Sequence, residues 1–161
     1  MPLILVRHAQ AGSRQDFHGD DTLRPLTGRG RHQAADIAGL VKEFATGLDI
    51  TIRTSPYRRC VETIAPLAAS LGIVAAIDSS LAEGPTEEAR RAVRIVAPLL
   101  SKQAEVWCSH GDIIPAVIEM LAVQDGLDLG KEPRVQKGSI WVLGTDDDGA
   151  FNEARYIGPT C

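Results

Sequence analysis

The chain has 161 residues, of which 44% are hydrophobic and 24% are charged, and its formal net charge at pH 7 is −4. This length and this balance are typical of one globular domain, so we expect a single domain over residues 1–161. The acidic balance argues against nucleic acid as a partner, and no window approaches the roughly 18 apolar residues of a membrane span.

The cysteine content argues against a disulfide-stabilised protein and against a zinc protein. Cys60, Cys108 and Cys161 are odd in number and scattered, without a C-x-x-C pair. This usage is typical of a reducing compartment and disfavours both a disulfide framework and a zinc site. Because Arg7 also comes too early for an apolar signal segment, we expect a cytoplasmic protein. Cys60 and Cys108 lie in apolar runs and are expected in the core.

The first half of the chain alternates strand and helix patterns. Residues 3–6 (LILV) form the apolar run expected of a strand that is buried on both faces. Residues 28–44 place apolar side chains at helical spacing and predict an amphipathic helix. Residues 49–53 alternate as a short strand. A helix is expected at 57–71, where Pro66 predicts a kink or a break.

The second half repeats this alternation and ends in a hairpin. Strands are predicted at 73–77 and 105–108, and helices at 86–101 and 112–123. The runs 139–144 and 151–157 flank an Asp-Gly turn, which favours a hairpin. The whole pattern predicts an α/β fold, a three-layer sandwich with a mostly parallel central sheet and helices on both faces.

Polar side chains follow four of the predicted strands. Arg7 and His8 come after the first strand, and an arginine pair that includes Arg59 comes after the second. Glu83 follows the third strand, and His110 follows the fourth. Because ligands bind beyond the carboxyl ends of the strands in open α/β sheets, we expect these residues to converge on one pocket.

These residue types together suit the chemistry of a phosphate ester. Arginine offers a planar fork of donors that matches phosphate oxygens. Histidine serves as a nucleophile or a proton donor near neutral pH. A glutamate in a pocket can protonate a leaving group. A positive pocket on an acidic protein indicates a small phosphorylated ligand, and the pattern alone leaves open which histidine is the nucleophile.

Three segments resemble the motifs of the histidine phosphatase superfamily, which is also called phosphoglycerate mutase-like. Residues 3–9 (LILVRHA) resemble its strand–Arg–His–Gly motif, residues 55–63 (SPYRRCVET) resemble Ser-Pro-x-x-Arg-Ala-x-x-Thr, and residues 106–111 (VWCSHG) resemble its late His-Gly motif. Residues 24–30 (RPLTGRG) resemble the small bacterial phosphohistidine phosphatases. Several stretches also resemble the histidine-phosphatase domain that some actinobacterial chains carry behind a Nudix hydrolase domain.

This resemblance implies a role for each matched position. His8 would be the nucleophile that becomes a phosphohistidine, and Arg7 and Arg59 would hold the phosphate oxygens. His110 would complete the pocket and stabilise the transferred group. Glu83 resembles the proton donor of phosphatase members, which protonates the leaving oxygen and then activates water. The scheme implies no metal and no other cofactor.

Two further residues are expected at the rim of the pocket, and a third residue departs from the family motif. Arg24 and Lys137 are candidate substrate-binding residues at the rim, with a surface role equally open. Ala9 replaces the motif glycine, which is compatible with the fold only if the backbone there does not need a positive φ.

The sequence therefore predicts a metal-independent phosphatase, with the substrate left open. The short loop 12–21 favours an open mouth and thus a phosphohistidine protein, and the alternative is a nucleotide or small-metabolite phosphomonoester. A mutase is disfavoured because so short a chain lacks insertions that would shield a phosphorylated intermediate from water. A non-catalytic phosphate-binding module is the alternative from another class. Oligomeric state and any partner enzyme are not readable from the sequence.

Overall fold

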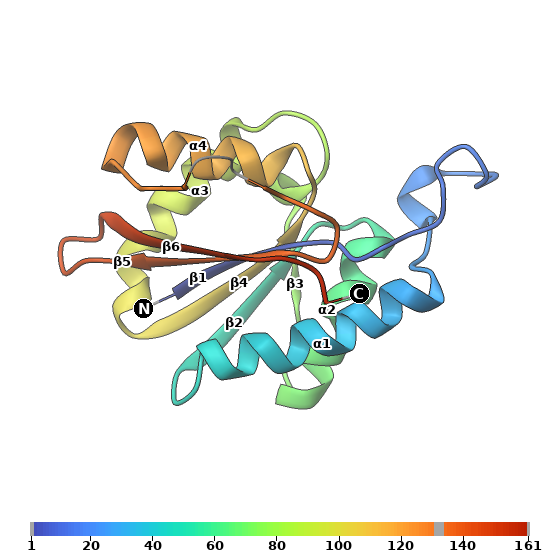
Figure 1. Cartoon of the computed structure of the whole chain (residues 1–161), viewed down its shortest axis with the longest axis horizontal. Coiled ribbons are helices and arrows are strands. Elements are labelled where there is room, and N and C mark those ends of the chain that lie inside the picture. The colour runs from blue at the N-terminus through green and yellow to red at the C-terminus, as the bar shows by residue number, and fades with distance from the viewer. Residues whose placement is uncertain (1, 131–133, 161) are drawn as a thin grey trace.

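In the computed structural model, which describes residues 2–130 and 134–160, six strands form one sheet. They are β1 (Pro2–Arg7), β2 (Asp49–Thr54), β3 (Ala76–Ile77), β4 (Gln103–Ser109), β5 (Ile140–Thr145) and β6 (Phe151–Ile157). Their order across the sheet is β3-β2-β4-β1-β5-β6 (Figure 1). The first four strands in this order pair in parallel, whereas β5 is antiparallel to both β1 and β6. The predicted mostly parallel sheet with a closing hairpin is confirmed.

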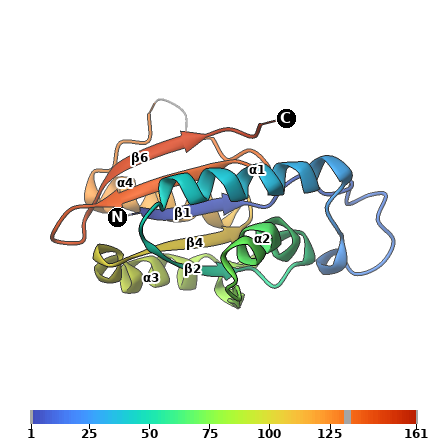
Figure 2. The same ribbon diagram turned by 90° about the horizontal axis from the view of Figure 1, so that it is seen from below.

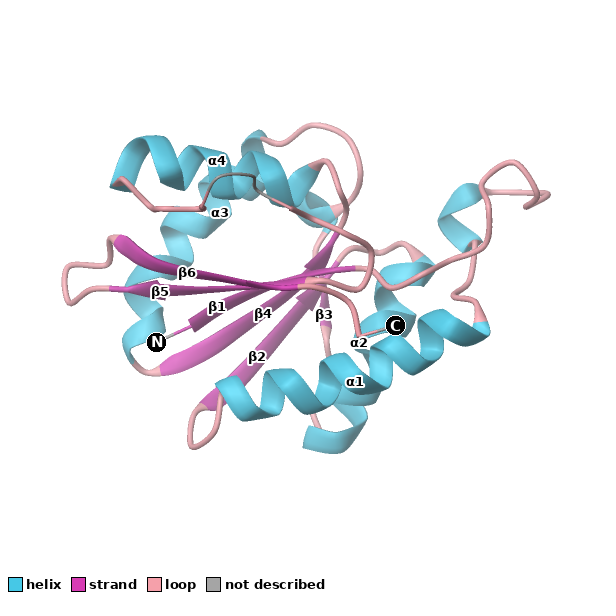
Figure 3. Cartoon of the chain, viewed as in Figure 1, coloured by secondary structure: helices cyan, strands magenta, loops and turns pink. Residues whose placement is uncertain are grey.

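Helices cover both faces of this sheet and complete three layers (Figure 3). The α-helices of the described residues are α1 (Gly28–Phe44), α2 (Arg58–Leu71), α3 (Glu87–Val96) and α4 (Ile113–Asp125). Helices α1 and α2 pack side by side on one face, and α3 and α4 lie on the other (Figure 2). Along β1, Ile4 packs in the core under α1 and α2, and Leu5 packs in the core under α3 and α4. Both residues are at most 2% exposed. This two-sided burial explains the continuous apolar run of β1.

The structure departs from the prediction at three elements. Helix α2 continues through Pro66 without a break, which was one of the two outcomes predicted there. The helix predicted at 86–101 becomes a 3-10 helix at Ala97–Ser101, since Pro98 cannot donate to the preceding turn. The strand predicted at 73–77 is reduced to Ala76–Ile77, two exposed residues at the sheet edge.

The order of the strands places three carboxyl ends side by side. Strand β4 lies between β1 and β2, and all three run in the same direction. The loop between β1 and α1 extends beyond this edge (Figure 1) and contains the short 3-10 helix η1 (Asp21–Leu23). The chain therefore brings the segments after β1, β2 and β4 to one end of the molecule.

Helix α1 begins against the segment that follows His8. The Thr27 hydroxyl caps the helix by accepting from the Gly30 N–H, and it lies within hydrogen-bond distance of the Gln10 carbonyl. A Cβ atom on Gly30 would lie 2.0 Å from the Gln10 carbonyl oxygen, so only glycine allows this approach. The Thr-x-x-Gly spacing thus fixes the start of α1 relative to the end of β1.

Two of the cysteines fit the sequence prediction. Cys60 and Cys108 are free thiols and completely buried, as expected of small core residues, whereas Cys161 lies outside the described residues. Within the described part of the chain, every helix is too short or too polar to cross a membrane.

Candidate active site

His8 stands directly after β1 and is fixed by its backbone. Its N–H donates to the Ser109 carbonyl at 3.0 Å, and its carbonyl accepts from the Gly138 N–H at 3.0 Å. The side chain is only 3% exposed, and its Nδ1 lies 2.9 Å from the Ala9 carbonyl oxygen. Because a carbonyl can only accept, Nδ1 carries the proton and the neutral ring keeps a lone pair on Nε2.

The charge state of His8 follows from its surroundings. Burial lowers the pKa of His8 to about 3, and the positive charges of Arg59 and Arg7 act in the same direction. The imidazole is therefore neutral at pH 7, which is the form that can act as a nucleophile.

The second motif supports the backbone next to His8. The Thr63 hydroxyl accepts from the Ala9 N–H at 2.9 Å and donates to the Arg59 carbonyl at 2.6 Å. The Arg-x-x-x-Thr spacing is one turn of α2, so the same turn carries Arg59 and holds Ala9. Ala9 is completely buried and does not have a positive φ, which satisfies the condition that its methyl group imposes.

Arg7 extends from β1 across the third motif. Its Nη1 donates to the Val135 carbonyl, and its buried Nε has no hydrogen-bond partner. A Cβ atom on Gly111 would lie 2.7 Å from Cζ of Arg7. A side chain at position 111 would therefore displace the Arg7 guanidinium, which lies directly over the backbone of this motif glycine.

Arg59 is completely buried and makes two ion pairs. Its Nη2 lies 2.7 Å from Oε1 of Glu83, and its Nη1 lies 3.3 Å from Oδ2 of Asp21. Its guanidinium also packs over the Tyr57 ring at 4.8 Å. The neighbouring Arg58 is 55% exposed and pairs with Glu62 instead, so the structure places Arg59 and not Arg58 in the site.

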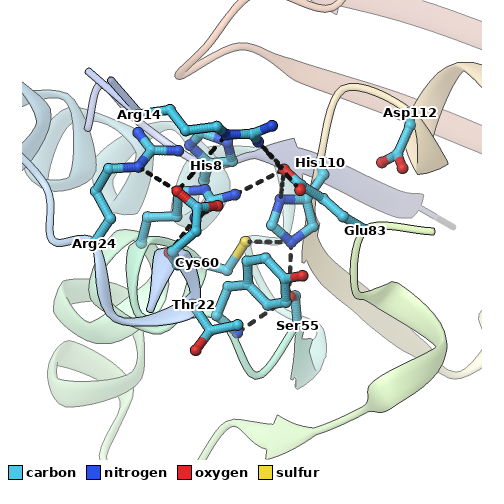
Figure 4. A network of polar contacts seen from close by, with 12 residues as sticks. His8, Arg14, Thr22, Arg24, Ser55, Cys60, Glu83, His110 and Asp112 are labelled. Carbon is cyan, nitrogen blue, oxygen red and sulfur yellow. Dashed lines mark hydrogen bonds and ion pairs between the residues drawn. The ribbon is translucent and has the colours of Figure 1, made fainter. Parts of the chain in front are cut away.

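His110 joins the site from the end of β4. Its Nε2 lies 2.8 Å from the Ser55 hydroxyl oxygen and 3.5 Å from the Cys60 sulfur (Figure 4). Its Nδ1 lies 3.3 Å from Oε1 of Glu83 but is buried without a hydrogen bond. The ring centroids of His8 and His110 are 5.4 Å apart. His110 thus has an unsatisfied Nδ1 directed at the same carboxylate that Arg59 holds.

Three carboxylates lie near these residues, and their environments differ. Asp21 is held ionised: burial acts to raise its pKa, but the hydrogen bond from Arg24 and the charges of Arg59 and Arg14 outweigh this and lower it. Asp112 uses both oxygens to accept backbone N–H groups, those of Gly84 and Ile113. Glu83 alone faces the cleft.

A cleft of about 420 Å³ opens in front of His8. Its lining comprises Arg7, His8, Gly12, Ser13, Arg14, Arg24, Glu83 and Lys137. Both rim candidates of the sequence therefore line it, although Arg24 is only 5% exposed. Among the residues that the structure describes, no group of three or more His, Cys, Asp and Glu side chains is arranged to hold a metal ion.

Sequence reasoning missed two residues of this site. Arg14 reaches from the β1–α1 loop to Glu83, with Nη2 3.3 Å from Oε2 (Figure 4). Asp21 joins Arg59 to Arg24. Both belong to a polar loop, where a lone arginine or a pair of aspartates looks like any solvated surface. Nothing in the local pattern distinguishes them.

Two sequence comparisons relate the chain to known proteins. The model of the histidine phosphatase superfamily (branch 1) matches residues 3–88, more than half of the chain. Over 162 residues the chain is 31% identical to a Mycolicibacterium smegmatis protein named 8-oxo-(d)GTP phosphatase, and this covers 98% of the chain and 48% of that protein. The chain spans about half the length of this curated relative.

Solved structures show the same fold. A protein from Nakamurella multipartitia, described as a phosphohistidine phosphatase SixA, superposes with a TM-score of 0.74 at 25% identity, over 99% of this chain and 96% of that chain. The protein histidine phosphatase SixA complexed with tungstate gives a TM-score of 0.74 at 19% identity, with 96% of both chains covered. The predicted phosphoglycerate mutase-like fold and the prediction of a phosphatase are confirmed. The chain belongs to the histidine phosphatase superfamily (branch 1).

Proposed function

We propose that this chain is a metal-independent phosphatase that works through a phosphohistidine intermediate on His8. The observation that carries the proposal is the state of His8: a buried, neutral imidazole with its proton on Nδ1, lining a cleft with Arg7. In the first step Nε2 attacks phosphorus while the bond to the leaving oxygen breaks. Arg7, Arg59 and His110 would hold the phosphoryl oxygens during this transfer.

Glu83 is the proposed proton donor, because it is the one of the three carboxylates that lines the cleft with His8, whereas Asp112 is engaged by two backbone donors. The carboxyl group would give its proton to the departing oxygen. It would then take a proton from water as that water attacks phospho-His8, which releases phosphate and restores the histidine. Glu83 is ion-paired with Arg59, so a phosphate that binds Arg59 would replace this carboxylate.

Two substrate classes have separate support. A phosphohistidine protein is supported by the structural similarity to the 25% identical SixA protein. A small phosphorylated molecule is supported by the cleft itself, whose volume is in the range of small-ligand sites. It is also supported by the exposed side chain of Arg14, which reaches across to Glu83. The name of the 31% identical relative points the same way. We favour the small molecule because Arg14 narrows the mouth that a protein substrate would need.

The test is hydrolysis of p-nitrophenyl phosphate in excess EDTA by the wild type and by His8→Ala. The wild type should turn over in the chelator, and loss of the nucleophile should slow turnover by several orders of magnitude. His32→Ala, which changes an exposed histidine on α1, is the matched control and should keep wild-type activity. Undiminished activity of His8→Ala would exclude His8 as the nucleophile, and dependence on a metal would contradict the proposed route.

A further inference from the structure

The cleft carries more positive charge than a single phosphate group requires. Arg7, Arg14, Arg24 and Lys137 all line it, and Glu83 is the one carboxylate in the lining. A phosphate monoester carries at most two negative charges, and the proposed function already assigns the inner site, Arg7, Arg59 and His110, to them. The remaining three cations lie in a protein whose net charge is −4, so their concentration here is a local feature.

Lys137 is the least compensated of these cations. It makes no hydrogen bond or ion pair with any other described residue, although it borders the cleft. Burial lowers the pKa of Lys137, and the charges of Arg7, Arg24, Arg59 and Arg14 lower it further. Like charges gathered in this way repel one another, and an anionic ligand would relieve the repulsion.

The two arginines of the β1–α1 loop are placed beside this lysine. Arg24 is almost fully buried and is fixed by Asp21, with Nε 2.9 Å from Oδ1, and by the Gly12 carbonyl. Arg14 is 65% exposed and shares Asp21 and Glu83 with the other arginines. Figure 4 shows both arginines entering the network from the side of His8. One is a rigid donor and the other is free to adjust to a ligand.

We propose that Lys137, Arg14 and Arg24 form a second anion subsite, and that the substrate is a small organic diphosphate whose terminal phosphoryl group is transferred to His8. This inference rests on the proposed function. Nε2 of His8 would attack the terminal phosphorus, and the anhydride bond would break with its electron pair on the bridging oxygen. The leaving group is then a phosphate monoester, whose developing negative charge is stabilised by Lys137 and Arg14. Water subsequently hydrolyses phospho-His8 and releases phosphate.

Binding of two inert anions tests the subsite without depending on turnover. Inorganic phosphate and methylenediphosphonate are titrated calorimetrically into the protein at fixed ionic strength and in EDTA. The wild type should bind the diphosphonate at least tenfold more tightly. In Lys137→Met the loss of affinity for the diphosphonate should be at least five times the loss for phosphate, and Lys137→Arg should restore the preference.

Lys42→Met, which removes an exposed lysine from α1, is the matched control and should retain the wild-type preference. Equal affinity of the wild type for both anions, or equal losses for both in Lys137→Met, would overturn the subsite and leave the phosphatase proposal standing. Failure of both anions to bind would instead overturn the phosphate site itself, and with it the proposed function.

Discussion

A buried histidine among arginines must stay neutral if it is to attack phosphorus. The burial that keeps His8 neutral also makes the folded protein less stable at acidic pH. Its pKa is lowered to about 3 in the folded protein, chiefly by burial, against an ordinary value of 6.5. Between these two values the unfolded chain binds a proton that the folded chain does not. The free energy of unfolding should therefore fall as the pH drops from 6.5 towards 3, by up to about 1.4 kcal/mol per pH unit from this residue.

Urea denaturation of the wild type and of His8→Gln at several pH values between 7.5 and 4.5 measures this contribution. The variant cannot titrate at position 8, so its stability should fall less steeply below pH 6.5. Parallel curves for the two proteins would show that His8 is not the group responsible.

Gly111 is the second residue for which a single added atom matters, because its backbone lies directly under the Arg7 guanidinium. In Gly111→Ala the new methyl group would overlap the Arg7 guanidinium, which would have to leave its position over the backbone. We expect inorganic phosphate to bind at least tenfold more weakly, measured by calorimetry. Gly39→Ala, on α1 with no atom within 4 Å of the added Cβ, is the control. It should bind phosphate normally and gain up to about 1 kcal/mol in stability.

At the level of elements, one turn of α2 links Arg59, the proposed phosphate-binding arginine, to the strand that presents His8, the proposed nucleophile. Thr63→Val keeps the shape of the side chain but leaves the buried Ala9 N–H without its acceptor. We expect a loss of about 1–3 kcal/mol in the free energy of unfolding, together with a lower kcat, because the segment after His8 is no longer held. Thr63→Ser retains the hydroxyl and should recover most of both losses. If Thr63→Ser were as damaged as Thr63→Val, the methyl packing and not the hydrogen bond would be responsible.

The elements also show what the sequence could and could not predict. The helix predicted at residues 28–44 has the bounds of α1, because apolar side chains at helical spacing run along the face that it buries. The strand predicted at 73–77 is longer than the observed β3, since a strand at the edge of the sheet has a hydrogen-bonding partner on one side only. The strand ends led to His8, Arg59 and His110, whereas nothing pointed to Asp21. The contact of Asp21 with Arg59 depends on how a polar loop folds back over α2. The spacing of apolar residues in the sequence carries no information on that fold.

At the scale of the whole molecule, a net charge of −4 coexists with a cleft lined by four cations and one carboxylate. The acidic remainder of the surface repels a phosphate dianion, and the cleft attracts it, so association should depend on screening. Charges at the cleft mouth are screened over about 10 Å at 0.1 M salt.

We expect kcat/KM for p-nitrophenyl phosphate to fall severalfold between 20 and 300 mM potassium chloride, a range over which the screening length shortens about fourfold. The value of kcat should change little, because the inner site is buried around His8, Arg59 and His110 and is screened far less than the mouth. The measurement is a set of initial-rate curves at fixed pH, repeated with potassium acetate so that specific competition by chloride is separated from screening. A KM independent of both salts would mean that the rim cations do not contribute to substrate capture. The phosphate would then be recognised entirely by the buried residues behind them.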